Sequence, residues 1–154
     1  MRRLAPAAGA FPTLILLLAF SMGCGAGGRD GRDLAHDLEG TVSSSTVERL
    51  AGHFDLSRAP VVVSVASAGE QTFGASDQPA LEASLRDALQ PYDGARLSVT
   101  QQVYEESSAS TGTLTLTLAL EQQGTTRYVP VIFDLDRSGR RATVTRLRMM
   151  APGR

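Results

Sequence analysis

Three stretches in the second half of the chain alternate apolar and polar residues, which is the pattern of strands that bury one face. They span residues 111–120, 127–135 and 142–149. In the first, every second residue is leucine (Leu114, Leu116, Leu118 and Leu120). In the second, the inward positions are apolar (Val129, Val131, Phe133 and Leu135). Short polar turns separate the stretches, so we expect a meander of antiparallel strands.

Two irregularities interrupt this meander. Pro130 falls inside the second stretch and cannot donate a hydrogen bond to a neighbouring strand, which predicts an edge strand or a bulge. In the third stretch the apolar phase shifts between Val144 and Leu147, and this shift also indicates a bulge or a weaker register.

The first half of the chain contributes two further strands. Residues 59–67, APVVVSVAS, are apolar in both phases, which is typical of a central strand covered on both sides. Residues 95–104 alternate, with Leu97, Val99 and Val103 expected on one face. The segment between 68 and 77 is predicted to be a loop.

Helical spacing occurs in two places. Residues 78–90 carry Pro79 in the first turn and one apolar stripe, and Pro91 ends the pattern. The stripe consists of Leu81, Leu85, Ala88 and Leu89. Residues 33–54 also show helical spacing, with a break at Gly40 and the polar run 43–46.

These elements predict an α+β fold, with residues 33–150 forming a single domain. One mixed, mainly antiparallel sheet of about five strands would pack on one or two helices. A right-handed crossover through the helix at 78–90 could make the strands at 61–66 and 95–104 parallel. A cystatin-like or nuclear-transport-factor-like arrangement, a helix on a meander, is the alternative.

The N-terminus has the three parts of a secretory signal. Arg2 and Arg3 precede an apolar run at 14–20, and small residues lead to Cys24, which is the sole cysteine. This segment resembles a bacterial lipobox, although Ser21 stands where that signal usually has leucine. We therefore expect a signal peptide at 1–23, a lipid on Cys24, and a flexible glycine-rich tether at 24–32. An ordinary signal that leaves a soluble periplasmic or secreted protein is the alternative.

Composition narrows the possible functions. Without the signal, thirteen arginines face sixteen acidic residues, a formal charge of −3, which argues against binding to nucleic acid. The chain has no tryptophan and few aromatic residues, so a base-stacking or sugar-stacking surface is not expected.

No catalytic, cofactor or metal motif is complete. His36 lies near Asp33 and Asp37, but this loose spacing is more typical of a solvated helix face. Residues 134–139 match the first half of a calcium loop, but Thr145 occupies the position of the closing glutamate. We therefore predict no enzyme activity, no cofactor and no metal site.

Two features are candidates for contact with a partner. Phe73 is the one large apolar residue in the predicted loop, and either anchors that loop or forms an exposed contact. The C-terminal meander is basic (Arg137, Arg140, Arg141, Arg146 and Arg148). These arginines either protect a sheet edge from pairing or bind an acidic partner.

Residues 59–100 read as strand, polar loop, helix ALEASLRDAL, turn and strand. This order is similar to the start of the outer-membrane lipoproteins that activate penicillin-binding proteins, and to the Tol propeller N-terminal domain and the curli secretion lipoprotein. The resemblance identifies no site residue. Because the expected lipid anchor and tether come with no catalytic motif, we expect a non-catalytic domain that binds or regulates a cell-envelope protein. Gly25 follows Cys24 where inner-membrane retention signals commonly carry aspartate, so we expect the domain on the periplasmic face of the outer membrane. The alternative is a periplasmic domain that binds a small ligand between helix and sheet.

Overall fold

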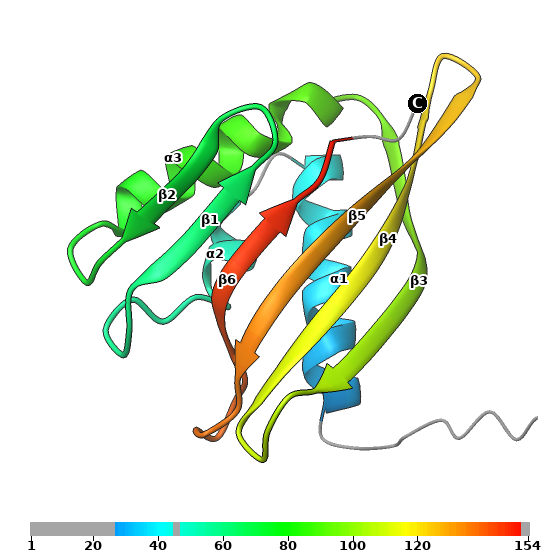
Figure 1. Cartoon of the computed structure of the whole chain (residues 1–154). Helices are drawn as coiled ribbons and strands as arrows, with labels where there is room; N and C mark the ends of the chain where they lie inside the picture. Colours follow the sequence, from blue (N-terminus) through cyan, green and yellow to red (C-terminus); the bar gives the residue numbers. More distant parts are fainter. Residues whose placement is uncertain (1–26, 45–46, 152–154) are drawn as a thin grey trace, which may run out of the picture.

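The computed structural model describes residues 27–44 and 47–151, and these form an α+β domain with one six-stranded sheet (Figure 1). In chain order the elements are α1 (Gly27–Ser44), α2 (Glu48–Ala51), β1 (Val61–Val65), β2 (Gly69–Phe73), α3 (Gln78–Leu89), the short 3-10 helix η1 (Gln90–Tyr92), β3 (Arg96–Glu106), β4 (Thr111–Gln122), β5 (Thr125–Asp136) and β6 (Thr143–Met149). The predicted fold class is confirmed, and the strand order across the sheet is β2-β1-β6-β5-β4-β3.

The three predicted strands of the meander form the centre of the sheet. β4 pairs antiparallel with β5 along its whole length, and β5 pairs antiparallel with β6. The turn between β4 and β5 consists of Gln123 and Gly124, which have φ angles of 51° and 75°. A two-residue hairpin with positive φ at both positions matches the right-handed twist of the strands.

The helices cover one face of the sheet, and the hydrophobic core lies between the helices and this face (Figure 1). The leucines of β4 at 114, 116, 118 and 120 are all buried on this inner face. Helix α1 packs against β3 and buries Leu34, Leu38 and Val42. Helix α3 buries the predicted stripe of Leu81, Leu85, Ala88 and Leu89.

Helix α1 begins at Gly27, so residues 27–32 are helical rather than part of the predicted tether. Gly31 is buried, and a Cβ at this position would overlap the side-chain amide of Gln102 on β3. The absence of a side chain at Gly31 therefore lets this end of α1 approach the sheet closely. The signal peptide, Cys24 and the start of the tether lie outside the described residues.

Residues 69–73 form the edge strand β2, not a loop. β2 pairs antiparallel with β1, and Val61 lies opposite Phe73. Only 6% of Phe73 is exposed, because the side chain points into the core beneath the edge of the sheet. The interpretation of Phe73 as an exposed contact is therefore wrong, and its role as an anchor is confirmed.

The parallel neighbour of β1 is β6, with Val63 opposite Leu147. β3 lies at the far edge of the sheet, and the chain of antiparallel pairs from β6 to β3 makes it run opposite to β1. The predicted parallel relation between β1 and β3 is therefore wrong. The last strand occupies the position beside β1, and this separates the two strands.

A bulge in β3 reverses the faces of its second half. The register against β4 shifts between Val99 and Gln101. Val99 donates its backbone N–H to Oε1 of Glu39 on α1, at 2.7 Å. Beyond the bulge, Gln102 and Tyr104 lie opposite the inner leucines of β4, while Val103 is 38% exposed on the outer face. The prediction that Val103 shares a face with Val99 is therefore wrong.

The two irregularities predicted in the meander have distinct outcomes. The register between β5 and β6 shifts after Asp134, which confirms the bulge inferred from the phase shift in β6. The prediction of an edge strand or a bulge at Pro130 is wrong, because β5 is an interior strand and its register against β4 continues through Pro130. β6 instead ends beside Pro130, whose carbonyl accepts the N–H of Met150 at 3.2 Å. The proline therefore lies where β5 extends past its neighbour, so its missing N–H interrupts no ladder.

Replacing Phe73 tests whether it is a core residue. Phe73→Ala should lower the free energy of unfolding by about 3 kcal/mol, because it removes a buried aromatic side chain. Thr72→Ala, at an exposed position of the same strand, should change it by less than about 0.5 kcal/mol. Urea unfolding followed by circular dichroism measures both values. Equal effects of the two substitutions would contradict the anchoring role.

Candidate functional site

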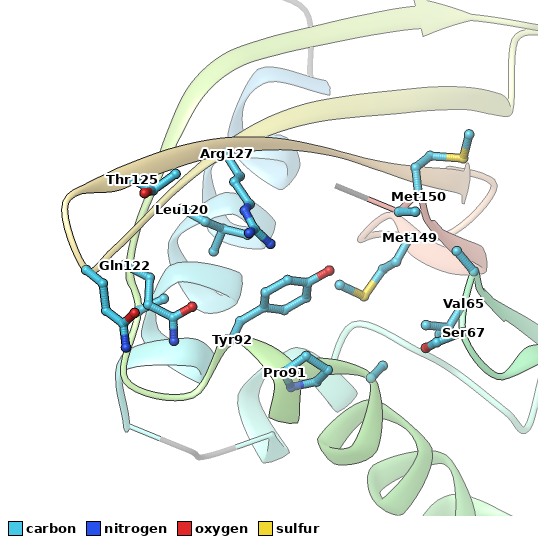
Figure 2. A pocket seen from close by; sticks show the side chains of 15 residues that line it. Val65, Ser67, Pro91, Tyr92, Leu120, Gln122, Thr125, Arg127, Met149 and Met150 are labelled. Atoms are coloured by element: carbon cyan, nitrogen blue, oxygen red, sulfur yellow. The ribbon is translucent and has the colours of Figure 1, made fainter. Parts of the chain in front are cut away.

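A pocket of about 440 Å³ opens between the end of α3 and the far end of the β4–β5 hairpin (Figure 2). Its walls come from the ends of β1 and β6, from η1, and from the hairpin. The lining residues are Val65, Ala66, Ser67, Ala88, Pro91, Tyr92, Ala95, Leu120, Gln122, Gln123, Thr125, Arg127, Met149, Met150 and Ala151.

The pocket exists because the helical cover stops before the sheet does. Pro91 cannot continue α3, and the chain leaves through η1 towards β3. The β4–β5 hairpin continues past the end of β6, so its tip has no β6 partner, and Pro91 and Tyr92 of η1 line the pocket from the opposite side. The result is a space with an apolar floor and a polar rim.

The floor of the pocket belongs to the hydrophobic core. Val65, Ala88, Leu120 and Met149 are buried and line the pocket at the same time. The rim carries hydrogen-bonding groups, namely Ser67, Gln122, Gln123, Thr125 and Arg127. Apolar walls with a few convergent polar groups are typical of small-molecule sites.

Tyr92 and Arg127 point into the pocket from different walls, Tyr92 from η1 and Arg127 from β5 (Figure 2). Burial raises the pKa of the Tyr92 phenol above its ordinary value, because the charged phenolate is poorly solvated there. The hydroxyl is therefore protonated at neutral pH and can donate a hydrogen bond into the pocket.

Sequence reasoning did not identify these pocket residues, although one of them leaves a signal. Arg127 lies two residues before Val129 and therefore continues the row of alternate, inward-facing positions of β5. The other members of this row are Val131, Phe133 and Leu135. A charged residue in an apolar phase is informative, because it marks the point where the inward face of the strand leaves the core and becomes exposed. Tyr92 leaves no such signal, because its position depends on where α3 ends against the sheet.

The predicted basic cluster lies away from the pocket, since none of its five arginines lines it. Arg148 donates to Asp134 at 2.8 Å, and Arg137 donates to the Tyr104 hydroxyl at 3.0 Å. Arg140 and Arg141 are exposed in the β5–β6 turn. Arg146 and Arg148 lie on the outer face of β6, which is an interior strand, so the interpretation as protection of a sheet edge is wrong for these two.

The half-match to a calcium loop forms a turn that is held by Asp136 and by Arg58 from another part of the chain. Asp136 accepts the backbone N–H of Ser138 at 2.8 Å, and Arg58 donates to Ser138 Oγ at 2.6 Å. The hydrogen bond from the Ser138 backbone is the main cause that lowers the pKa of Asp136. Within residues 27–44 and 47–151, no three potential ligands gather in a way that could hold a metal ion.

His53 forms the one histidine–carboxylate pair of the described residues, with its Nε2 2.8 Å from Oδ2 of Asp37. The pair joins α1 to the segment after α2, and the carbonyl of His53 accepts the N–H of Val144 on β6. Neither residue lines the pocket. His36, the other histidine, is exposed on α1.

None of the helices in the described part of the chain combines the length and the apolar character needed to cross a membrane.

No protein-family model and no curated protein sequence matches the chain. Solved structures do match its fold. A protein of unknown function with a cystatin-like fold from Nostoc punctiforme has a TM-score of 0.62 and 11% identity, over 79% of this chain and 88% of that one. An NTF2-like protein with a cystatin-like fold from Novosphingobium aromaticivorans has a TM-score of 0.54 and 14% identity, over 79% and 80%.

An enzyme also shares the fold. A type 2 hexachlorocyclohexane dehydrochlorinase, LinA, has a TM-score of 0.55 and 16% identity, over 84% of this chain and 90% of that one. At these identities the similarity concerns the fold alone. The chain therefore has an NTF2-like, cystatin-like fold, which is the alternative arrangement expected from the sequence.

The burial of Tyr92 can be tested by its titration. In the tyrosine Cζ resonances of the ¹³C-labelled protein, the signal that Tyr92→Phe removes should titrate with a midpoint above the ordinary value of about 10. The raised pKa stabilises the fold below pH 10, and this contribution is lost as the pH rises through the folded-state pKa. A midpoint at or below the ordinary value would contradict the buried position of the hydroxyl.

Proposed function

We propose that the folded domain binds a small, largely apolar molecule in the pocket and does not transform it chemically. The observation that carries this proposal is the pocket itself, which has an apolar floor, a polar rim and a volume of about 440 Å³. Small-molecule sites commonly have volumes between about 300 and 1,000 Å³.

The placement of the titratable groups favours binding over catalysis. General acid–base catalysis requires a proton-transferring group within hydrogen-bond reach of the bound molecule. The His53–Asp37 pair is not part of the pocket lining. Arg127 and Tyr92, which are part of it, are better suited to hold a ligand than to remove a proton from it at neutral pH.

A neutral fluorescent probe, N-phenyl-1-naphthylamine, tests the proposal. The probe should bind saturably with one site per chain, and Ala95→Phe should lower its affinity at least about tenfold, because a phenyl ring at the pocket wall takes up the space of the probe. Fluorescence titration of the purified chain measures the affinity.

Ala68→Phe is the matched control, since Ala68 is exposed in the turn after β1 and does not line the pocket. Its affinity for the probe should equal that of the unmodified chain. The absence of saturable binding, or equal loss of affinity in the two variants, would overturn the proposal.

For localisation, we propose that Cys24 carries a lipid and holds the domain on the periplasmic face of the outer membrane. The support is the signal-like sequence before Cys24 and the lack of a second cysteine with which it could pair. An envelope protein that binds the domain is a second candidate function, because such an anchor would keep the domain beside partners in the membrane.

Replacing Cys24 with alanine should release the protein from the membrane fraction, or leave it as an unprocessed precursor. Several acyl chains, each contributing about 0.8 kcal/mol per buried CH₂, would otherwise hold it firmly. Cell fractionation with metabolic palmitate labelling provides the measurement, and Thr72→Ala, which changes an exposed residue outside the signal, is a control that keeps the thiol. If the protein with its natural Cys24 is found soluble and carries no palmitate label, lipidation is contradicted.

A further inference from the structure

We infer that the ligand of the pocket is a small apolar monocarboxylate, whose carboxylate binds Arg127 and whose hydrocarbon part lies on the apolar floor. This inference rests on the proposed binding function and specifies the chemical class of the ligand.

The charge distribution of the pocket is the first argument. Among the described residues that line it, Arg127 is the only charged one, and no aspartate or glutamate is present. The nearest acidic residue along β4 is Glu121, but its neighbours Leu120 and Gln122 line the pocket, so strand alternation directs Glu121 to the opposite face. The described lining therefore favours an anion over a cation, because it carries one positive charge and no carboxylate.

Arg127 is available for a ligand. Within the described part of the chain, its guanidinium takes part in no hydrogen bond, ion pair or ring contact. By contrast, Arg58, Arg137 and Arg148 each contact a side chain of the protein. Figure 2 shows the Arg127 side chain directed into the pocket from β5, towards the Tyr92 ring that enters from η1.

The donors match a carboxylate better than other anions. A guanidinium can bind both carboxylate oxygens through two parallel N–H groups, and the protonated Tyr92 hydroxyl offers one further donor. A phosphate monoester carries nearly twice the charge and three acceptor oxygens, and such groups are commonly bound by several cations or by a helix N-terminus. The described lining of the pocket has a single cationic side chain, so a ligand with one negative charge would balance its charge.

The rest of the pocket fits a hydrocarbon chain. Val65, Leu120 and Met149 form the floor, and Pro91 and Ala95 extend the wall. Methionine is unbranched and flexible, so Met149 and the neighbouring Met150 can adjust to ligands of different shape. A sugar would meet few of the polar partners that it needs, because the floor offers no hydrogen-bonding side chains.

Displacement of N-phenyl-1-naphthylamine by three ligands of equal chain length tests the inference. Octanoate, 1-octanol and octylammonium each have eight carbons, and their head groups are anionic, neutral and cationic respectively. In the unmodified chain, octanoate should displace the probe at a concentration about tenfold lower than 1-octanol, a difference of about 1.4 kcal/mol, and octylammonium should be the weakest.

The ratio between octanoate and 1-octanol, measured within one variant, is the readout. Arg127→Gln should reduce the ratio to about one, and the control Arg140→Gln, which changes an exposed arginine outside the pocket, should preserve it. Equal displacement by octanoate and 1-octanol in the unmodified chain, or an unchanged ratio in Arg127→Gln, would overturn the carboxylate assignment and leave the pocket function intact. Failure of the neutral probe itself to bind would instead overturn the proposed function.

Discussion

The structure depends on covering the apolar inner face of one sheet. The alternate leucines of β4 are fully or almost fully buried, and they are flanked by the equally apolar inner faces of β5 and β6. Helix α1 covers the side towards β3, while α3 covers the side towards β1 and β2. Because the strands of the hairpin are longer than this cover, one end of the inner face stays open and forms the pocket.

The edge strand β3 shows how the cover determines local geometry. Its bulge lies where Glu39 of α1 accepts the N–H of Val99. After the bulge, the polar Gln102 faces inward, and Gly31 provides the space that its side chain requires. A polar residue on the inner face is thus compatible with the fold, because it lies at the margin where helix and sheet meet.

Much of the architecture is visible in the sequence, and the errors have physical causes. The alternation in β4 and β5 and the stripe of α3 predict those elements because burial on one face governs their composition. The segment GEQTF gives no such pattern, since only Phe73 of β2 is buried and pairing with β1 determines the rest. The helical start of α1 is hidden because its glycines are poor helix formers, and packing on β3 compensates for them. In the pocket, the position of Arg127 can be predicted because it falls on the inward-facing alternation of β5. Tyr92 and Met149 come together only through the tertiary structure.

The division of the pocket into a core floor and a surface rim has a consequence for how such a protein diverges. Exchanges at Gln122, Thr125 or Arg127 affect side chains that the core does not need, so natural selection for folding leaves these positions free to vary. The floor, by contrast, is constrained by stability whatever the ligand is. Descendants of one ancestral fold can therefore acquire different ligands rapidly while their interiors remain recognisable. In such a lineage, the positions that vary most between paralogues are the ones that report specificity.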